Sequence, residues 1–301
     1  MEQALLITVA LKYDKAFDVE MSKDELFQLA STANAEVVEE VVVGRDRIDP
    51  TYFIGSGKVE ELCEVIKDAK IDTVIFNNDL SSSQQRNLEE ALGIKTIDRT
   101  QLILDIFAQH AKSQEGKLQV ELAQLDYLLP RLSGKGIMLS RLGGGIGTRG
   151  PGEQKLEVDR RRIRERIAKL KNELKSLDAH RKNLREKRHR QTTPVVAIVG
   201  YTNAGKSTLL NALTGANQIV KDSLFTTLDS LSRAHILKNH QKVIFSDTVG
   251  FLDRLPHGLI EAFKATLEEV KEANLLIHVL DISFPKYEER AKAVRVVLEE
   301  L

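Results

Sequence analysis

The sequence of 301 residues lacks the features by which secreted and membrane-spanning proteins are usually recognised. Its single cysteine, Cys63, excludes an internal disulfide, and no group of His and Cys residues has the spacing of a zinc site. The longest apolar runs, such as residues 5–11, are too short to cross a bilayer. The first residues carry Glu2 and no basic segment, so they do not resemble a signal peptide. We therefore expect a soluble protein of a reducing compartment.

Hydrophobic residues make up 42% of the chain, which excludes wholesale disorder, and the length predicts two or three domains. The net charge of zero conceals an asymmetry. Residues 155–190 contain 15 Lys and Arg against 6 Asp and Glu, so the rest of the chain carries a net charge of −9. A dense basic block on a balanced protein favours a polyanionic partner over a merely solvated helix face.

Residues 1–97 are expected to form an N-terminal α/β domain. Apolar strands are predicted at 5–11, 37–43 and 71–76, and helices at 23–34, 58–69 and 82–92. Ser81 is a plausible N-cap for the last helix, and Gly93 a plausible stop. Alternating strands and helices favour a parallel sheet. The turn at 55–58 (Gly-Ser-Gly-Lys) opens a helix and could hold an anion, or could be an ordinary loop.

Residues 98–191 are expected to form a long antiparallel helical hairpin. Leucines 118, 122, 125 and 129 recur at heptad spacing, and residues 163–184 continue the pattern on a second helix, from about 153 to 190. Pro130 should end the first helix. The connecting loop, 134–152, contains eight glycines and the basic residues Lys135, Arg141 and Arg149, with Arg131 just before it. Such a loop could wrap a phosphate backbone or serve as a flexible linker, and it has no aromatic residue for base stacking.

Residues 192–301 contain a phosphate-binding loop. A buried strand at 194–199 leads into Gly-Tyr-Thr-Asn-Ala-Gly-Lys-Ser and then into a helix, which is the strand–loop–helix context that G-x-x-x-x-G-K-S requires. The glycines allow successive amides to face the phosphates, Lys206 supplies a charge to the outer phosphates, and Ser207 supplies a hydroxyl for Mg²⁺. The predicted loop consists of Gly200, Tyr201, Thr202, Asn203, Ala204, Gly205, Lys206, Ser207 and Thr208.

Two further segments complete the predicted nucleotide site. A second apolar strand, 242–246, ends in Asp247, Thr248, Val249 and Gly250, where Asp247 would hold Mg²⁺ through water and Gly250 would face the terminal phosphate. Between the two motifs, a threonine is needed to complete the magnesium shell, and we favour Thr227 over Thr226. The segment that carries it consists of Phe225, Thr226, Thr227, Leu228 and Asp229.

From residue 98 onward the sequence resembles the HflX-type GTPases, a ribosome-associated family of P-loop GTPases related to translation factors. The resemblance is carried by residues 105–109, 116–125, 143–153 (GGGIGTRGPGE), 159–161, 200–208 (GYTNAGKST), 225–229 and 247–255 (DTVGFLDRL). Residues 52–62 and 76–89 also resemble the N-terminal domain of this family.

The resemblance implies a GTP-hydrolysing factor that binds the large ribosomal subunit and helps to split stalled ribosomes. GTP would be the substrate, with Mg²⁺ as cofactor, and Lys206 and Thr227 would be the catalytic residues. Ser207, Thr227 and, through water, Asp247 would hold the metal. The residues expected to contact ribosomal RNA are Arg141, Arg149, Arg160, Arg161 and Arg162.

The sequence differs from many small GTPases in two respects. Phe251 occupies the position where a glutamine often orients the attacking water, so hydrolysis by the protein alone should be slow. The chain also contains no N-K-x-D motif to read guanine, and we expect a G domain that is incomplete at its C-terminus, with an unpaired strand edge near Val195 or Leu276. Uncovered apolar surface is expected at Val294, Val297 and Leu298.

Three functions are compatible with these residues: a GTPase acting on ribosomes, a phosphohydrolase that accepts both ATP and GTP, and a ribosomal-RNA-binding module with a degenerate G domain. The expected fold is mixed α/β: a parallel α/β domain, a helical hairpin and a P-loop GTPase domain. We expect a cytoplasmic monomer with no membrane span that binds GTP, GDP and the large ribosomal subunit, and peripheral membrane association is compatible with this.

Overall fold

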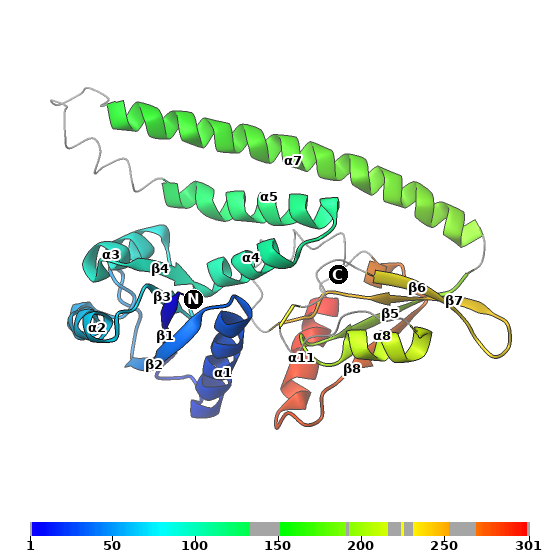
Figure 1. Ribbon diagram of the computed structural model, residues 1–301, viewed down its shortest axis with the longest axis horizontal. Coiled ribbons are helices and arrows are strands. Elements are labelled where there is room, and N and C mark those ends of the chain that lie inside the picture. The colour runs from blue at the N-terminus through cyan, green and yellow to red at the C-terminus, as the bar shows by residue number, and fades with distance from the viewer. Residues whose placement is uncertain are drawn as a thin grey trace. The chain divides into compact units, whose positions relative to one another are not determined.

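The computed structural model describes residues 2–132, 151–190, 193–215, 224–225, 231–252 and 269–299, and side chains within helix α7 for residues 157–177 and 179. These residues belong to two compact units that alternate along the chain (Figure 1). The first comprises Met1–Ile106 and Gln124–Ile167, and the second comprises Phe107–Ala123 and Ala168–Leu301. Within the described residues, no helix is long and apolar enough to cross a membrane.

The first unit is built on a four-stranded parallel sheet with the order β2-β1-β3-β4. Strand β1 is buried on both faces, as expected of a central parallel strand. The sheet and its connecting helices consist of β1 (Gln3–Leu11), α1 (Ala16–Thr32), β2 (Glu36–Arg45), α2 (Ser56–Ala69), β3 (Thr73–Phe76), α3 (Ser82–Leu92), β4 (Lys95–Asp98) and α4 (Arg99–His110).

The predicted boundaries of α3 are confirmed, and so are their causes. Ser81 accepts a hydrogen bond from the Gln84 amide, and the Gln84 side chain accepts one from the Ser81 amide, which is a complete capping box. Gly93 ends the helix with a φ of 71°, in the left-handed region. In contrast, α1 starts earlier than predicted, at Ala16, because its N-cap residue, Lys15, makes no side-chain capping bond that could mark the start.

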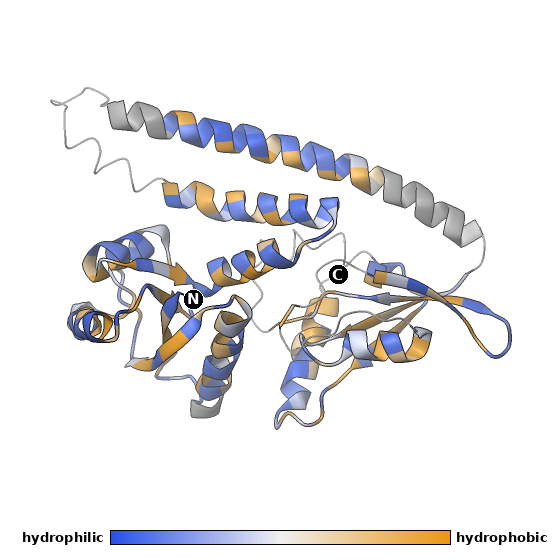
Figure 2. Cartoon of the chain, in the orientation of Figure 1, coloured by the Kyte–Doolittle hydropathy of each residue, from blue (hydrophilic) through white to orange (hydrophobic). Residues whose placement is uncertain are grey.

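The helical region consists of α5 (Gln114–Arg131) and α7 (Pro151–Arg190). Pro130 lies inside α5, which ends one residue later. Leu118, Ile167 and Leu170 of the predicted apolar seam are buried. At about 1.5 Å per residue, the 40 residues of α7 span about 60 Å. In the coloured part of α7, Figure 2 shows mainly hydrophilic residues interrupted by short apolar bands.

The second unit contains a four-stranded sheet with the order β6-β7-β5-β8, in which only the β6–β7 pair is antiparallel. Its described elements are β5 (Val195–Gly200), α8 (Lys206–Thr214), β6 (Leu231–Ile236), β7 (Lys242–Asp247), β8 (Leu275–Val279) and α11 (Tyr287–Glu299). All four strands lie where the sequence predicts apolar strands, near Val195, Ile236, Val243 and Leu276. Together with the N-terminal parallel sheet and the helical region, this confirms the predicted mixed α/β class with a P-loop domain.

Among the described strands, β8 lies at an edge of the sheet, as predicted near Leu276, whereas β5 lies between β7 and β8. Leu275 and Leu276 of β8 are 58% and 42% exposed. The prediction for the last helix was wrong at Val294, which is fully buried, whereas Val296 is 45% exposed. Ala291 and Val294, three residues apart, form the buried face of the helix, and Val297 and Leu298 are partly exposed.

Candidate nucleotide-binding site

The phosphate-binding loop connects the end of β5 to the start of α8. Gly205 is the N-cap residue of α8 and has a φ of 89°, a conformation that L side chains rarely adopt. Gly200 is required for a different reason, since a Cβ atom there would lie 2.5 Å from the carbonyl oxygen of Val279 on β8. The two glycines therefore permit a turn at one end of the loop and a close approach of two strands at the other.

Lys206 is the first residue of α8 and is only 6% exposed. Its Nζ atom donates a hydrogen bond of 2.8 Å to the carbonyl oxygen of Tyr201, across the loop. Burial lowers the pKa of Lys206 to about 8, against the opposing effect of the Asp247 carboxylate, which raises it. The ammonium group is thus held inside the loop, where an anion that entered would stabilise its charged form.

Ser207 and Asp247 meet beside the loop. The Ser207 hydroxyl donates a hydrogen bond of 2.5 Å to Oδ2 of Asp247, a fully buried carboxylate. Their proximity follows from the sheet, because Asp247, the last residue of β7, pairs with Ile198 on β5. A hydroxyl and a carboxylate are the hard oxygen ligands that Mg²⁺ prefers, so these two residues fit a magnesium site.

The residues after Asp247 pack directly against the phosphate-binding loop. The Thr248 hydroxyl donates to the carbonyl oxygen of Ile198 at 2.8 Å. A Cβ atom on Gly250 would lie 2.6 Å from the Cα atom of Thr202, so only glycine fits there. Phe251 then forms a parallel bridge with Tyr201: its amide donates to the Gly200 carbonyl at 3.1 Å, and its carbonyl accepts from the Thr202 amide at 2.7 Å.

Phe225 is the one residue of the predicted 225–229 segment that the structure describes. Its amide donates to the Thr202 hydroxyl at 3.0 Å, and its ring is 2% exposed. The ring packs against Phe107 of α4 and not against the loop. Phe225 therefore anchors the start of the segment, and its side chain does not contact the phosphates. Four of the predicted binding residues lie outside the described residues: Thr226, Thr227, Leu228 and Asp229.

The structure therefore brings together the predicted residues 200–208, Phe225 and Asp247, Thr248, Val249 and Gly250 around one loop. The predicted RNA-contacting residues are distributed differently. The side chains of Arg161 and Arg162 on α7 are 70% and 74% exposed, whereas Arg160 is only partly exposed. Arg141 and Arg149 lie outside the described residues.

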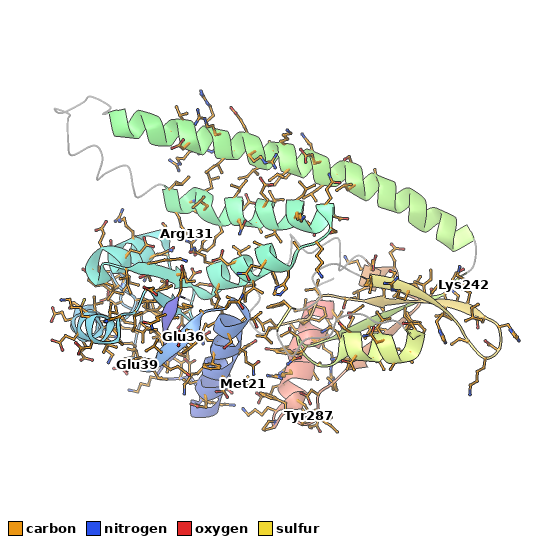
Figure 3. All side chains as sticks on the ribbon, in the orientation of Figure 1. Met21, Glu36, Glu39, Arg131, Lys242 and Tyr287 are labelled. Carbon is orange, nitrogen blue, oxygen red and sulfur yellow. The ribbon has the colours of Figure 1, made fainter. Side chains whose placement is uncertain are left out.

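Arg131, labelled in Figure 3, has a role that the sequence did not reveal. Its guanidinium group pairs with the buried Asp98 carboxylate at 3.0 Å and also donates to the Leu80 carbonyl and to Gln85. Tyr127 donates to the same carboxylate at 2.8 Å, and the Arg131 guanidinium stacks on its ring. Arg131 is therefore occupied within the first unit. Burial raises the pKa of Asp98, although these partners oppose the shift.

The fold and the geometry of this loop define the class of the protein: a P-loop GTPase with its phosphate-binding loop, D-x-x-G segment and mainly parallel sheet in place. Three family models match successive parts of the chain. They are described as "GTP-binding GTPase N-terminal" for residues 20–108, "GTP-binding GTPase Middle Region" for residues 110–188 and "50S ribosome-binding GTPase" for residues 195–301.

Curated relatives specify the family. The chain is 54% identical over 300 residues to a GTPase HflX of Caldanaerobacter subterraneus and 45% identical over 300 residues to GTPase HflX of Escherichia coli. Each match covers the whole chain and 69% or 70% of the relative. The chain belongs to the HflX family of GTPases and is a GTP-hydrolysing enzyme.

Solved structures agree with this assignment. A GTP-binding protein from Sulfolobus solfataricus in complex with GDP is 27% identical, with a TM-score of 0.54, and the match covers 100% of this chain and 78% of that protein. A second structure, described as a complex of SsGBP and GDP, gives a TM-score of 0.58 at 28% identity, with the same coverage. Both similarities indicate that this chain shares its fold with GTP-binding proteins.

Proposed function

We propose that this protein binds GTP with Mg²⁺ at the 200–208 loop, hydrolyses it on the large ribosomal subunit and thereby helps to split stalled ribosomes. The proposal of nucleotide binding rests on two hydrogen bonds, from Lys206 to the Tyr201 carbonyl and from Ser207 to the Asp247 carboxylate. The family model for residues 195–301 and the relatives named above support the ribosomal part.

In this proposal the residues have separate roles. Lys206 compensates the negative charge of the outer phosphates. Ser207 and, through water, Asp247 hold Mg²⁺, with Thr227 as the third ligand, and the ion supplies charge neutralisation at the phosphates. The amides of residues 203–208 bind the phosphates, and Gly250 lies close enough to the loop to offer its amide to the terminal phosphate. Phe225 positions the start of the segment that carries Thr227.

The ribosome-binding surface is proposed on α7. Arg161 and Arg162 each have an acidic neighbour on the helix, Glu165 at 3.8 Å and Asp159 at 3.7 Å. Such exposed pairs contribute little, about 0.3–0.5 kcal/mol, so they leave the guanidinium groups available to RNA phosphates. We propose that Arg160 and the loop residues Arg141 and Arg149 extend this surface.

The nucleotide assignment is tested by titrating GTP, GDP and ATP into the 301-residue chain with Mg²⁺ and measuring phosphate release. We expect binding and turnover for the chain and neither for Lys206→Ala, with the N-terminal sheet still folded by circular dichroism. Unchanged GTP affinity in Lys206→Ala would contradict the assignment. Equal affinity for ATP and GTP would favour an enzyme that accepts both nucleotides.

The ribosomal assignment is tested by co-sedimentation with large ribosomal subunits at increasing salt. Binding through phosphates should fall by about 0.7–0.9 log units per log unit of salt for each phosphate neutralised. Replacing Arg160, Arg161 and Arg162 by Ala should flatten that slope. A control with the same loss of charge elsewhere, Lys238, Lys242 and Lys292 replaced by Ala, should keep the slope. If both triple variants behave like the unmodified chain, α7 does not bind RNA through these arginines.

We further propose a cytoplasmic monomer organised as residues 1–97, 98–191 and 192–301. Light scattering after gel filtration tests the monomer, and limited proteolysis tests the boundaries. Cleavage should concentrate near 192 and in the glycine-rich loop at 134–152, and the boundary near 98, which lies between β4 and α4, should resist it. A dimer in solution, or cuts mainly within the sheets, would overturn this organisation.

A further inference from the structure

Arg290 of α11 lies between two aromatic rings in the second unit. Its guanidinium carbon is 3.3 Å from the ring centre of Phe284 and 4.6 Å from that of Tyr201. Phe284 belongs to the connection between β8 and α11, and Tyr201 is the second residue of the phosphate-binding loop. Arg290 is therefore a direct contact between the last described helix and the nucleotide site.

The rings of Phe284 and Tyr201 are the main contacts of the Arg290 side chain. Among the described residues, the buried Nε atom of Arg290 has no hydrogen-bond acceptor. The nearby Asp281 carboxylate has its pKa lowered mainly by hydrogen bonds from Ser283, with a smaller contribution from Arg290. A planar guanidinium group stacks on aromatic faces, which a lysine ammonium cannot do, so this stack suits Arg more closely than Lys.

Tyr201 connects the stack to the functional lysine. Its ring is 5% exposed, and its carbonyl oxygen is the acceptor that holds the Nζ atom of Lys206 at 2.8 Å. The same carbonyl also accepts the Ala204 amide at 3.2 Å, so the orientation of the Tyr201 peptide determines both the curl of the loop and the place of the ammonium group.

The main chain on either side of Tyr201 makes contacts that do not involve α11. Gly200 lies against the Val279 carbonyl, and the bridge to Phe251 binds the atoms that flank Tyr201. The side chain of Tyr201 is thus the element through which α11 can act on the loop. We propose that Arg290 is a positioning residue for the GTPase reaction: by stacking on Tyr201, it holds the carbonyl that orients Lys206 toward the phosphates.

This inference rests on the proposed nucleotide site and is tested by GTP affinity and single-turnover hydrolysis of the 301-residue chain. Replacing Arg290 by Ala should weaken GTP binding by about 3- to 20-fold, the range that corresponds to loss of a largely desolvated cation–π contact. Arg290→Lys should restore part of the affinity, because it keeps the charge but loses the planar stack. Lys292→Ala, an exposed cation two residues away on α11, should bind GTP as the unmodified chain does.

A double-mutant cycle separates positioning from general support of the fold. Tyr201→Leu should weaken GTP binding by a similar factor, and Arg290→Ala should have little further effect in the Tyr201→Leu background. Thermal unfolding of every variant identifies any loss that follows from unfolding alone. Independent, multiplying effects of the two substitutions would overturn the inference, and so would full GTP affinity in Arg290→Ala. Absence of GTP binding by the unmodified chain would instead overturn the proposed function, and this inference with it.

Discussion

The ring of Phe225 meets the ring of Phe107 edge to face, with the ring centres 4.6 Å apart and the planes at 82°. Both rings are buried, and both belong to the second unit. Phe225 follows the phosphate-binding loop by only 17 positions and is also bonded to it through Thr202, whereas Phe107 comes from α4, far earlier in the chain. The contact therefore joins the helical part of this unit to the nucleotide site.

The first prediction concerns this aromatic pair. Replacing Phe107 by Leu removes the edge-to-face contact, worth about 0.5–1.5 kcal/mol, in addition to a packing loss. We expect the second unit to unfold at a lower denaturant concentration and GDP to dissociate faster, because the anchor of Phe225 is weakened. Tyr13→Leu, at a residue that is 77% exposed, is the control and should change neither measurement. Equal GDP dissociation rates for the two variants would refute the link.

The second prediction concerns the buried carboxylate of Asp98. Replacing Arg131 by Ala leaves that carboxylate without its cation and should destabilise the first unit by about 3–5 kcal/mol. Replacing both residues, as Asp98→Asn with Arg131→Met, should recover part of the loss, because no unpaired charge remains buried. Denaturant unfolding followed by circular dichroism measures both. A double variant as unstable as Arg131→Ala would show that the hydrogen bonds, and not the charge, determine the cost.

The third prediction separates two kinds of glycine. Gly200→Ala forces a Cβ atom to within 2.5 Å of the Val279 carbonyl oxygen and should cost about 1–3 kcal/mol, as overpacking does. Gly57→Ala is the matched control: it lies inside α2 with no heavy atom within 4 Å of the added group. The control should be neutral or more stable by up to about 1 kcal/mol, because Ala favours helix over Gly. Similar unfolding midpoints for the two variants would contradict the proposed close approach.

The fourth prediction is a pH dependence of Lys206. Because its pKa is about 8 in the nucleotide-free fold and 10.5 in a model peptide, the unfolded chain binds more protons between these values. The stability of the nucleotide-free protein should thus rise with pH across this window, while GTP affinity falls, because the phosphates require the ammonium form. Calorimetry at pH 8.5 in buffers of different ionisation enthalpy should detect proton uptake on GTP binding.

The control for that measurement is Lys206→Arg, which stays charged throughout the window. This variant should show no proton uptake from this position, whatever its affinity. Equal uptake by the lysine and arginine forms would assign the proton to another group. Uptake by neither would mean that Lys206 is already charged at pH 8.5 and that its burial lowers the pKa less than stated.

The fifth prediction concerns Phe251, whose side chain is 3% exposed and carries no hydrogen-bonding group. It cannot orient an attacking water, so turnover without a ribosome should be slow, on the order of 10⁻⁴–10⁻² per second. Single-turnover phosphate release from the protein alone measures this rate. Fast hydrolysis in the absence of ribosomal subunits would show that a water-orienting group already exists within the chain.

Much of the fold could be predicted because the local sequence determines it. The phosphate-binding loop, the four strands of the second unit and the capped helix α3 all have their signals within a few neighbouring residues. The short strand β4 was missed because its buried residues include Thr96 and Asp98, and polar side chains are buried only when distant partners bond to them. The partners of Asp98, Tyr127 and Arg131, come from another helix about 30 residues later.

Some residues of the candidate site can likewise be predicted from the local sequence, and others cannot. Lys206, Ser207, Asp247 and Gly250 follow from motif spacing, since strand ends in one parallel sheet lie at one edge. Arg290 and Phe107 could not be found from the sequence, because an arginine and a phenylalanine in amphipathic helices have no pattern that distinguishes them from ordinary packing residues. Only the tertiary contacts with Tyr201 and Phe225 identify them.

The bridge between Tyr201 and Phe251 has a consequence for mutagenesis. Its two hydrogen bonds run from main-chain amides to main-chain carbonyls, so no change of side chain removes a donor, except a change to proline. Alanine substitutions at Tyr201, Thr202 and Phe251 would therefore leave these two hydrogen bonds intact and would not reveal their importance. Replacing the amide of Phe251 or Thr202 by an ester would delete one bond at a time and reveal how firmly the D-x-x-G segment is attached to the phosphate-binding loop.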